Sequence, residues 1–175
     1  CYGYGAKGGR LFVQGNAAGR PMINAVGSPK LVINGTALDY LAESFMAGDP
    51  LDGGGFVIIN GMRFDERGEP EALETPYPGG NLFSLASGGA IYVRDPHERL
   101  SDSQLNGGAF TDMTEADWAV VEPMLRRNEE HFGIPLQRLL TVDGEVMSPS
   151  EVYRKIVPVK SKTLHAEAAW VGHHD

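Results

Sequence analysis

Cysteine is nearly missing from this sequence, which has one, Cys1, among 175 residues. A single cysteine excludes an internal disulfide, and it excludes any zinc or iron–sulfur site that several cysteines of the chain would build. Long hydrophobic runs are missing too, since no apolar stretch approaches the roughly 20 residues that cross a bilayer. No basic segment followed by an apolar one stands at the beginning, as a secretory leader would require. We therefore expect a cytoplasmic protein.

Positive charge is also scarce. Lys and Arg number 15 against 23 for Asp and Glu, so the formal net charge is −8. Binding to nucleic acid depends on clustered cations that contact phosphates, and docking on an anionic membrane depends on basic segments. The charge balance therefore argues against nucleic acid and against a membrane as partners.

Glycine, by contrast, is abundant. The chain has 23 glycines, a share of about 13% where about 7% is usual. Eleven prolines accompany them, yet 42% of the residues are hydrophobic, so the chain is not a disordered Gly/Pro tract. A normal apolar share with many glycines indicates a folded domain of short strands and tight corners.

A short phrase recurs in the first 95 residues. Each copy has a small or turn-prone residue, then several β-branched, aliphatic or aromatic residues, then one polar residue and a Gly or Asp. Short, β-prone segments bounded by such breakers are typical of strands. The copies span 9–15, 29–35, 55–61 and 89–95, with a weaker fifth copy at 79–85.

The spacing of the copies predicts how the strands pair. The copies end at Gly15, Gly35, Gly61 and Asp95, which are separated by 20, 26 and 34 residues. One strong strand in each interval of this length is typical of a solenoid that stacks each turn on the one before. We therefore expect a mainly β protein, a parallel β-helix, ahead of the alternative of an antiparallel sandwich.

Two of the copies close on an Asn-Gly dipeptide, at 34–35 and at 60–61. Glycine and asparagine accept the left-handed backbone region at little cost. We therefore expect Gly35 and Gly61 to occupy corners with positive φ.

The composition changes after Thr111, where glycines become fewer and charges more frequent. Thr114 and Asp117 have the spacing of a capping box at a helix start, and Pro123 should kink or split this helix. The apolar positions that follow at helical spacing are Trp118, Val121, Leu125 and Phe132.

A second helix start is predicted at Ser148-Pro149, with an acid at Glu151. Its apolar side should consist of Val152, Ile156 and Val157, and Pro158 should end it. We thus expect β-helix repeats over 1–110, a helical cap over 111–159 and a tail over 160–175.

No catalytic constellation stands above background. A nucleotide-binding loop needs a strand before its glycines and a helix after them, whereas the strand at 11–13 follows Gly3, Gly5, Gly8 and Gly9. Cys1 as a nucleophile would need an oxyanion hole and a pocket that nothing nearby supplies.

The histidines and the acidic residues form no recognisable site either. His97, His131, His165, His173 and His174 lack metal-site spacing, and His173-His174-Asp175 belongs to a chain end. The acidic residues of the long connections favour a solvated loop over a pair of hydrolytic carboxylates; they are Asp52, Asp65, Glu66, Glu69, Glu71 and Glu74. We predict no catalytic, cofactor-binding or metal-binding residue, and a scaffold rather than an enzyme.

The repeats resemble a known family. YGYGAKGGRLFVQGN at 2–16, VINGTALDYLAESFMAG at 32–48 and SGGAIYVR at 87–94 are similar, in this order, to the GXGXG domain, the C-terminal domain of the glutamate synthase large subunit. The segment at 114–117 with the helix that it begins, and the segment at 153–158, resemble the post-helix segment of that domain. The similarity covers roughly residues 2 to 160.

This resemblance implies a right-handed parallel β-helix with C-terminal capping helices. It implies a non-catalytic domain or subunit of a glutamate synthase-like oxidoreductase complex in glutamate biosynthesis. Such a domain braces a glutaminase domain against a synthase domain that carries FMN and iron–sulfur clusters, and it helps to wall the ammonia passage between them. The chain itself would bind none of these cofactors.

Three alternatives remain open. The chain could be a subunit of another redox complex, similar to the C subunit of formylmethanofuran dehydrogenase. It could be a self-associating structural module, which would make it a homo-oligomer. It could also be a stand-alone enzyme with its pocket in the acidic segment 63–78 or at Cys1.

Overall fold

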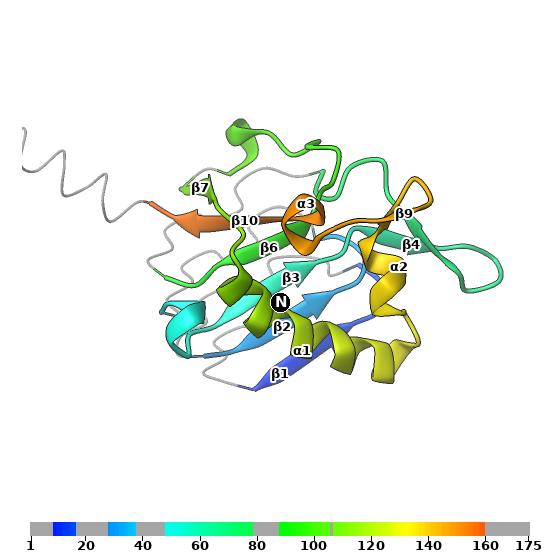
Figure 1. The fold of residues 1–175 in the computed structure, drawn as a ribbon, viewed down its shortest axis with the longest axis horizontal. Coiled ribbons are helices and arrows are strands. Elements are labelled where there is room, and N and C mark those ends of the chain that lie inside the picture. Colours follow the sequence, from blue (N-terminus) through cyan, green and yellow to red (C-terminus); the bar gives the residue numbers. More distant parts are fainter. Residues whose placement is uncertain (1–8, 17–27, 38–47, 79–87, 106, 160–175) are drawn as a thin grey trace, which may run out of the picture.

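The four strong copies of the repeated phrase form four neighbouring strands. They are β1 (Arg10–Val13), β2 (Lys30–Ile33), β3 (Phe56–Ile59) and β6 (Ile91–Arg94). The structure is a computed structural model that describes residues 9–16, 28–37, 48–78, 88–105 and 107–159, so the weaker copy at 79–85 and the tail at 160–175 lie outside the described residues. Figure 1 shows the strands side by side.

These four strands are parallel and in register. Val13 pairs with Ile33, Ile33 with Ile59, and Ile59 with Val93, so equivalent positions of the four copies stand in one row. The row continues past the strand ends, where Gly35 N donates to Gly15 O and Gly61 N donates to Gly35 O, both at 2.9 Å. The repeated phrase therefore marks one strand and one corner in each copy.

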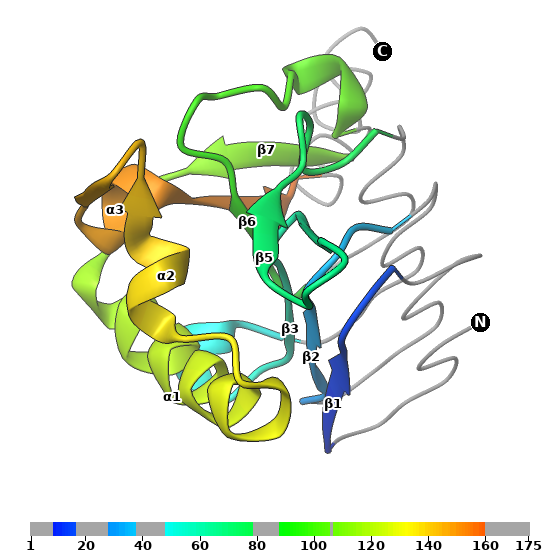
Figure 2. The ribbon, with the colours of Figure 1, turned by 90° about the vertical axis from the view of Figure 1, so that its right-hand side faces the viewer.

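The sheet is completed by strands of the opposite direction. β10 (Tyr153–Pro158) lies antiparallel between β6 and β7 (Gly108–Thr111), and the six strands follow the order β1-β2-β3-β6-β10-β7. Figure 2 shows β10 and β7 beyond β6. The end of the segment expected to cap the molecule thus becomes an inner strand of the sheet.

The prediction of a right-handed parallel β-helix is wrong. The described residues form a mixed, mostly parallel six-stranded sheet with helices against it, an α/β arrangement in which no solenoid is found. Any two parallel strands need a connection of a dozen or more residues. Intervals of 20 to 34 residues therefore predict parallel pairing, but they do not distinguish a coil from an open sheet covered by helices.

Helix α1 (Glu115–Phe132) covers one face of the sheet (Figures 1 and 2). It begins at the predicted capping box, in which the Thr114 hydroxyl accepts from Asp117 N at 3.2 Å, and it ends at Gly133, whose φ of 70° closes the last turn. Pro123 lies inside this helix without splitting it. A second helix, α2 (Leu136–Leu140), follows directly.

The predicted start at Ser148 is confirmed, but the helix there is short. Helix α3 (Pro149–Val152) has Ser148 as its N-cap and stops after one turn. Ile156 and Val157, expected on its apolar side, belong to β10 instead. Pairing with β6 and β7 on both sides overrides the helical start signal, because Tyr153, Ile156 and Val157 are all β-prone.

Both faces of the parallel strands are buried, as is usual when connections cover a parallel sheet. Residues of β2, β3 and β6 alternate between two apolar clusters. One cluster contains Ile33, Ile59 and Val93 together with Leu100 and Leu105. The other contains Val32, Phe56, Ile58 and Tyr92, and it packs against Val121 and Leu125 of α1. Each aliphatic side chain buried in this way contributes roughly 1.5–3 kcal/mol.

Two hairpins and two short helices complete the described chain. β4 (Met62–Phe64) pairs with β5 (Pro70–Ala72), and β8 (Thr141–Val142) pairs with β9 (Glu145–Val146). The 3-10 helices are η1 (Pro50–Asp52) and η2 (Asp102–Gln104). Among the described residues, no helix has the length and apolar character needed to cross a membrane.

Candidate functional site

Most of the residues considered as sites from sequence do not come together. The acidic segment 63–78 contains the β4–β5 hairpin, and Asp65 closes its turn by accepting from the N–H groups of Arg67 and Glu69 at 2.8 and 2.9 Å. Glu71 accepts from Arg63 across the hairpin at 3.1 Å. Asp52, Asp65, Glu66, Glu69 and Glu74 are exposed.

The two described histidines, His97 and His131, have different neighbours. His97 is exposed, with Nε2 3.7 Å from Asp143, and the ring of His131 lies 4.7 Å from that of Phe12. No three His, Cys, Asp or Glu side chains in the described ranges are arranged to hold a metal ion. Gly9 directly precedes β1 with a φ of 90°. Cys1, Gly3, Gly5, Gly8, His165, His173 and His174 lie outside the described residues.

A network of buried amides joins the strand corners to helix α1. The Asn34 amide donates to Asn128 Oδ1 at 2.7 Å and accepts from Asn128 Nδ2 at 2.7 Å. Asn34 also donates to Val13 O at 3.1 Å and accepts from Asn60 Nδ2 at 2.8 Å, while Tyr153 donates to Asn60 Oδ1 at 2.6 Å. We call Asn34, Asn60, Asn128 and Tyr153 the asparagine network; all four side chains are buried.

The network uses the hydrogen-bonding capacity of Asn34 completely, since its two N–H groups and two oxygen lone pairs all have partners. In the described residues, no buried side-chain nitrogen or oxygen lacks a hydrogen bond. Burial also raises the pKa of the Tyr153 hydroxyl, so it stays protonated and donates. A fully satisfied polar network in a low-dielectric interior favours one arrangement of the elements that it connects.

A second buried network lies at the other end of the helix face. Asp117 is fully buried, and it accepts from Tyr92 of β6 and from Lys155 of β10, both at 2.7 Å. It also accepts from the backbone N–H and the hydroxyl of Thr114. We call Asp117, Tyr92, Lys155 and Thr114 the aspartate network. It attaches the first turn of α1 to two strands of the sheet.

The electrostatics of this second network favour the charged carboxylate. Burial works to raise the pKa of Asp117, but the hydrogen bonds from Lys155, Thr114 and Tyr92 outweigh it and hold that pKa below its usual value. Burial, together with the bond to Asp117, raises the pKa of Tyr92, so this hydroxyl remains a donor. The network is therefore a carboxylate–ammonium pair completed by hydroxyl donors.

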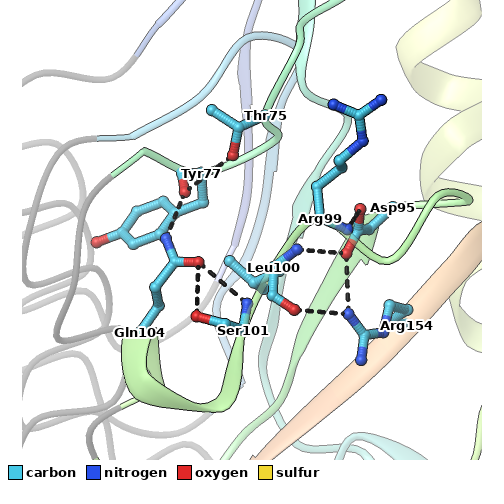
Figure 3. Close-up of polar contacts among 8 residues, drawn as sticks. All are labelled: Thr75, Tyr77, Asp95, Arg99, Leu100, Ser101, Gln104 and Arg154. Carbon is cyan, nitrogen blue, oxygen red and sulfur yellow. Dashed lines mark hydrogen bonds and ion pairs between the residues drawn. The ribbon is translucent and has the colours of Figure 1, made fainter.

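The loop after β6 is attached to β10 by a third group of contacts. Asp95 Oδ1 accepts from Arg99 N at 2.8 Å, and Asp95 Oδ2 accepts from Leu100 N at 3.0 Å and from Arg154 Nη1 at 2.9 Å. Figure 3 shows Arg154 also reaching the Leu100 carbonyl. The Arg154 guanidinium stacks 3.6 Å from the centre of the Phe110 ring, so both its charge and its flat face are used.

The same loop borders a cavity of about 270 Å³. Its walls come from Gly61 after β3, from the segment after β5, from the end of β6 and from α2 to β8. Arg94, Arg99 and Arg138 line it together with His97. Its position at the carboxyl ends of two adjacent parallel strands, β3 and β6, is where open parallel sheets commonly bind ligands.

Sequence reasoning found some of these residues and missed others. The Asn-Gly dipeptides at 34–35 and 60–61 stood out as corners, but not as members of a network, because Asn128 is 94 residues from Asn34 in sequence. Asp117 was found only as a helix cap. Two buried polar positions on the apolar face of α1, Asp117 and Asn128, were the signal that could have revealed its attachment to the sheet.

No protein-family model, no curated protein and no solved structure matches the chain.

Proposed function

We propose that this chain is a non-catalytic structural module of a glutamate synthase-like oxidoreductase complex. In this role it holds a glutaminase part and a synthase part, the latter carrying FMN and iron–sulfur clusters, at a fixed separation. The proposal begins from the residues that resemble the GXGXG domain. Those at 10–13, 32–33 and 91–94 lie in strands β1, β2 and β6, which run parallel in one sheet.

The observation that carries the proposal is that two separate buried networks attach α1 to the sheet. Asp117 and Asn128 lie on the same buried face of the helix, 11 residues apart, and each enters a different buried network. One network reaches β6 and β10, and the other reaches the corners after β2 and β3. A helix held by hydrogen bonds at both ends of its buried face resists sliding along the sheet.

Such resistance suits a bracing part. Apolar side chains alone tolerate small shifts between packed elements, whereas a shift here would leave buried charges and amides without partners, at about 1–3 kcal/mol for each group. A module whose helix and sheet do not shift against each other can keep two active sites at a constant distance.

The test is reconstitution with the glutaminase chain and the FMN-binding synthase chain of the same organism. We expect the purified chain alone to hydrolyse no glutamine and to oxidise no NAD(P)H. We expect it to form a complex with both partner chains, measured by size-exclusion chromatography with light scattering. When it is left out, more ammonia should escape to solvent for each glutamine hydrolysed.

Two results would overturn the proposal. One is steady turnover of glutamine or NAD(P)H by this chain alone, lost in a Cys1→Ala or Glu69→Ala variant, which would identify a stand-alone enzyme. The other is failure to associate with either partner chain, with ammonia escape unchanged whether the chain is present or not. Light scattering of the chain alone also tests self-association, since a stable homo-oligomer that excludes the partners would favour the self-associating module.

A further inference from the structure

We infer that the cavity between the end of β6, the β4–β5 hairpin and α2 binds a small oxyanion, a carboxylate or a phosphate group, through Arg94 and Arg138. This site is independent of the bracing function. The inference rests on two guanidinium groups that line one cavity and that no carboxylate of the described residues neutralises.

Arg94 is the deeper of the two cations. It is the last residue of β6 and only 6% exposed. Its Nε donates to Leu139 O at 2.7 Å and its Nη2 donates to Thr141 O at 2.9 Å. These two carbonyls fix the plane of the guanidinium but do not cancel its charge. Nη1 makes no hydrogen bond to any described residue, so it remains for a ligand.

Arg138 brings a second guanidinium to the same space from α2. Its Nη2 donates to Pro70 O at 2.9 Å, and it makes no ion pair within the described ranges. Burial lowers the pKa of Arg94, and the charge of Arg138 lowers it further, which indicates that the two cations interact. Holding two like charges together in a partly buried cavity is costly, and an anion between them relieves that cost.

The carboxylates around the cavity do not supply that anion. Asp95 is already paired with Arg154 and faces β10 (Figure 3). Asp143 lies 3.7 Å from His97, and both of these side chains are substantially exposed. Glu74 is exposed, and its backbone carbonyl accepts from Arg99 at 3.4 Å. Three arginines and three carboxylates therefore line the cavity, but none of the three carboxylates forms an ion pair with Arg94 or Arg138.

The dimensions limit the ligand. A volume of about 270 Å³ is slightly below the usual range of about 300–1,000 Å³ for small-molecule sites. Phosphate or a short dicarboxylate suits this space better than a nucleotide. A guanidinium group matches the oxygen spacing of both carboxylate and phosphate. The geometry therefore predicts an oxyanion of either kind, and the experiment distinguishes a carboxylate from a phosphate ligand.

The experiment titrates the full chain with inorganic phosphate and, separately, with succinate. Sodium chloride keeps the ionic strength constant, because general screening also changes with salt. Isothermal titration calorimetry gives the affinity, and amide chemical shifts locate the site. We expect saturable binding of at least one probe, with the largest shifts at 94–97 and 138–143. Phosphate alone would identify a phosphoryl ligand, and succinate alone a carboxylate ligand.

Three arginine variants make the test specific. Arg138→Gln removes a half-buried cation, and we expect binding to weaken at least about tenfold. Arg138→Lys keeps the charge but loses the fork, and should weaken binding less. Arg63→Gln, an identical change on β4 that does not line the cavity, should leave the affinity unchanged.

Either of two results would overturn the inference. One is no saturable binding of phosphate or succinate above the chloride control. The other is equal weakening in Arg138→Gln and Arg63→Gln, which would indicate attraction to overall charge. Should Arg138→Gln fail to fold, the shifts of the unaltered protein and the Arg138→Lys affinity decide the question.

Discussion

The side chains of Asn34 and Asn128 form a double hydrogen bond, each amide donating to the oxygen of the other at 2.7 Å, although 94 residues separate them in sequence. One belongs to a strand corner and the other to the buried face of α1. The pair thus connects the part of the chain that repeats with the part that does not. It also shows why the corner after β2 carries an asparagine, which serves the tertiary structure as well as the turn.

Replacing Asn128 by leucine should destabilise the protein by about 1–3 kcal/mol. Leucine keeps a similar volume but removes both hydrogen bonds of the pair. One N–H of Asn34 is then buried without a partner, and the Asn34 oxygen keeps only its bond from Asn60. Urea unfolding followed by circular dichroism measures the loss. Glu130→Leu, on the exposed side of the same helix, provides the control and should change stability by no more than about 0.5 kcal/mol. Equal stability of the two variants would contradict the role given to the pair.

Local patterns in the sequence predicted several elements well. The strands at 11–13, 31–33, 57–59 and 91–93 are present, and so are the helix starts after Thr114 and Ser148. These features depend on β-propensity, on breakers and on capping residues, all of which act over a few positions. They are therefore visible without knowledge of the partner segments.

The arrangement of the elements depended on distant residues and was not predictable in this way. Residues 153–157 follow a helix start but form a strand, because two other strands receive them. Likewise, Arg94 and Arg138 line one cavity only because α2 lies beside the end of β6. Neither fact has a local signature, and the spacing of the copies suits a solenoid and a sheet equally well.

Gly35 and Gly61, at the corners after β2 and β3, should both be sensitive to substitution, for different physical reasons. Gly61 has a φ of 62°, as expected, and a Cβ there would lie 3.0 Å from Pro76 Cα. Gly35 does not have a positive φ, so that expectation is wrong, but its Cβ would contact Asn16 Oδ1 and lie 2.6 Å from Gly15 O. Close approach of the stacked corners, rather than backbone conformation, therefore requires glycine at position 35.

We expect Gly61→Val and Gly35→Ala each to lower the free energy of unfolding by about 1–3 kcal/mol, through strain and through overpacking respectively. Gly15→Ala is the matched control, because nothing lies within 4 Å of a Cβ at that position and its φ is not in the left-handed region. It should stay within about 0.5 kcal/mol of the parent protein. Thermal unfolding of the three variants measures whether Gly15→Ala is more stable than Gly35→Ala and Gly61→Val. A Gly35→Ala variant as stable as Gly15→Ala would mean that the corners do not stack as closely as described.

The buried carboxylate of Asp117 should make stability depend on pH in the acidic range. Its pKa in the folded protein lies below the usual value, because hydrogen bonds from Lys155, Thr114 and Tyr92 outweigh the effect of burial. A depressed folded pKa adds stability that is complete above the unfolded value of about 3.9 and is lost as pH falls through the folded value. The free energy of unfolding should therefore decline from about pH 5 downward.

Comparison with Asp117→Asn isolates this contribution. At neutral pH the variant should be less stable by about 3 kcal/mol, because it leaves the Lys155 ammonium buried without its carboxylate. The difference from the parent protein should shrink as pH falls toward 3, because the unfolded parent then takes up a proton at Asp117 that the folded carboxylate, with its lowered pKa, binds less readily. Urea titrations at several pH values measure both curves, and Asp112→Asn, at an exposed aspartate, should follow the parent at every pH. A difference between parent and Asp117→Asn that stayed constant across this range would show that Asp117 acts by packing and capping alone, without its charge.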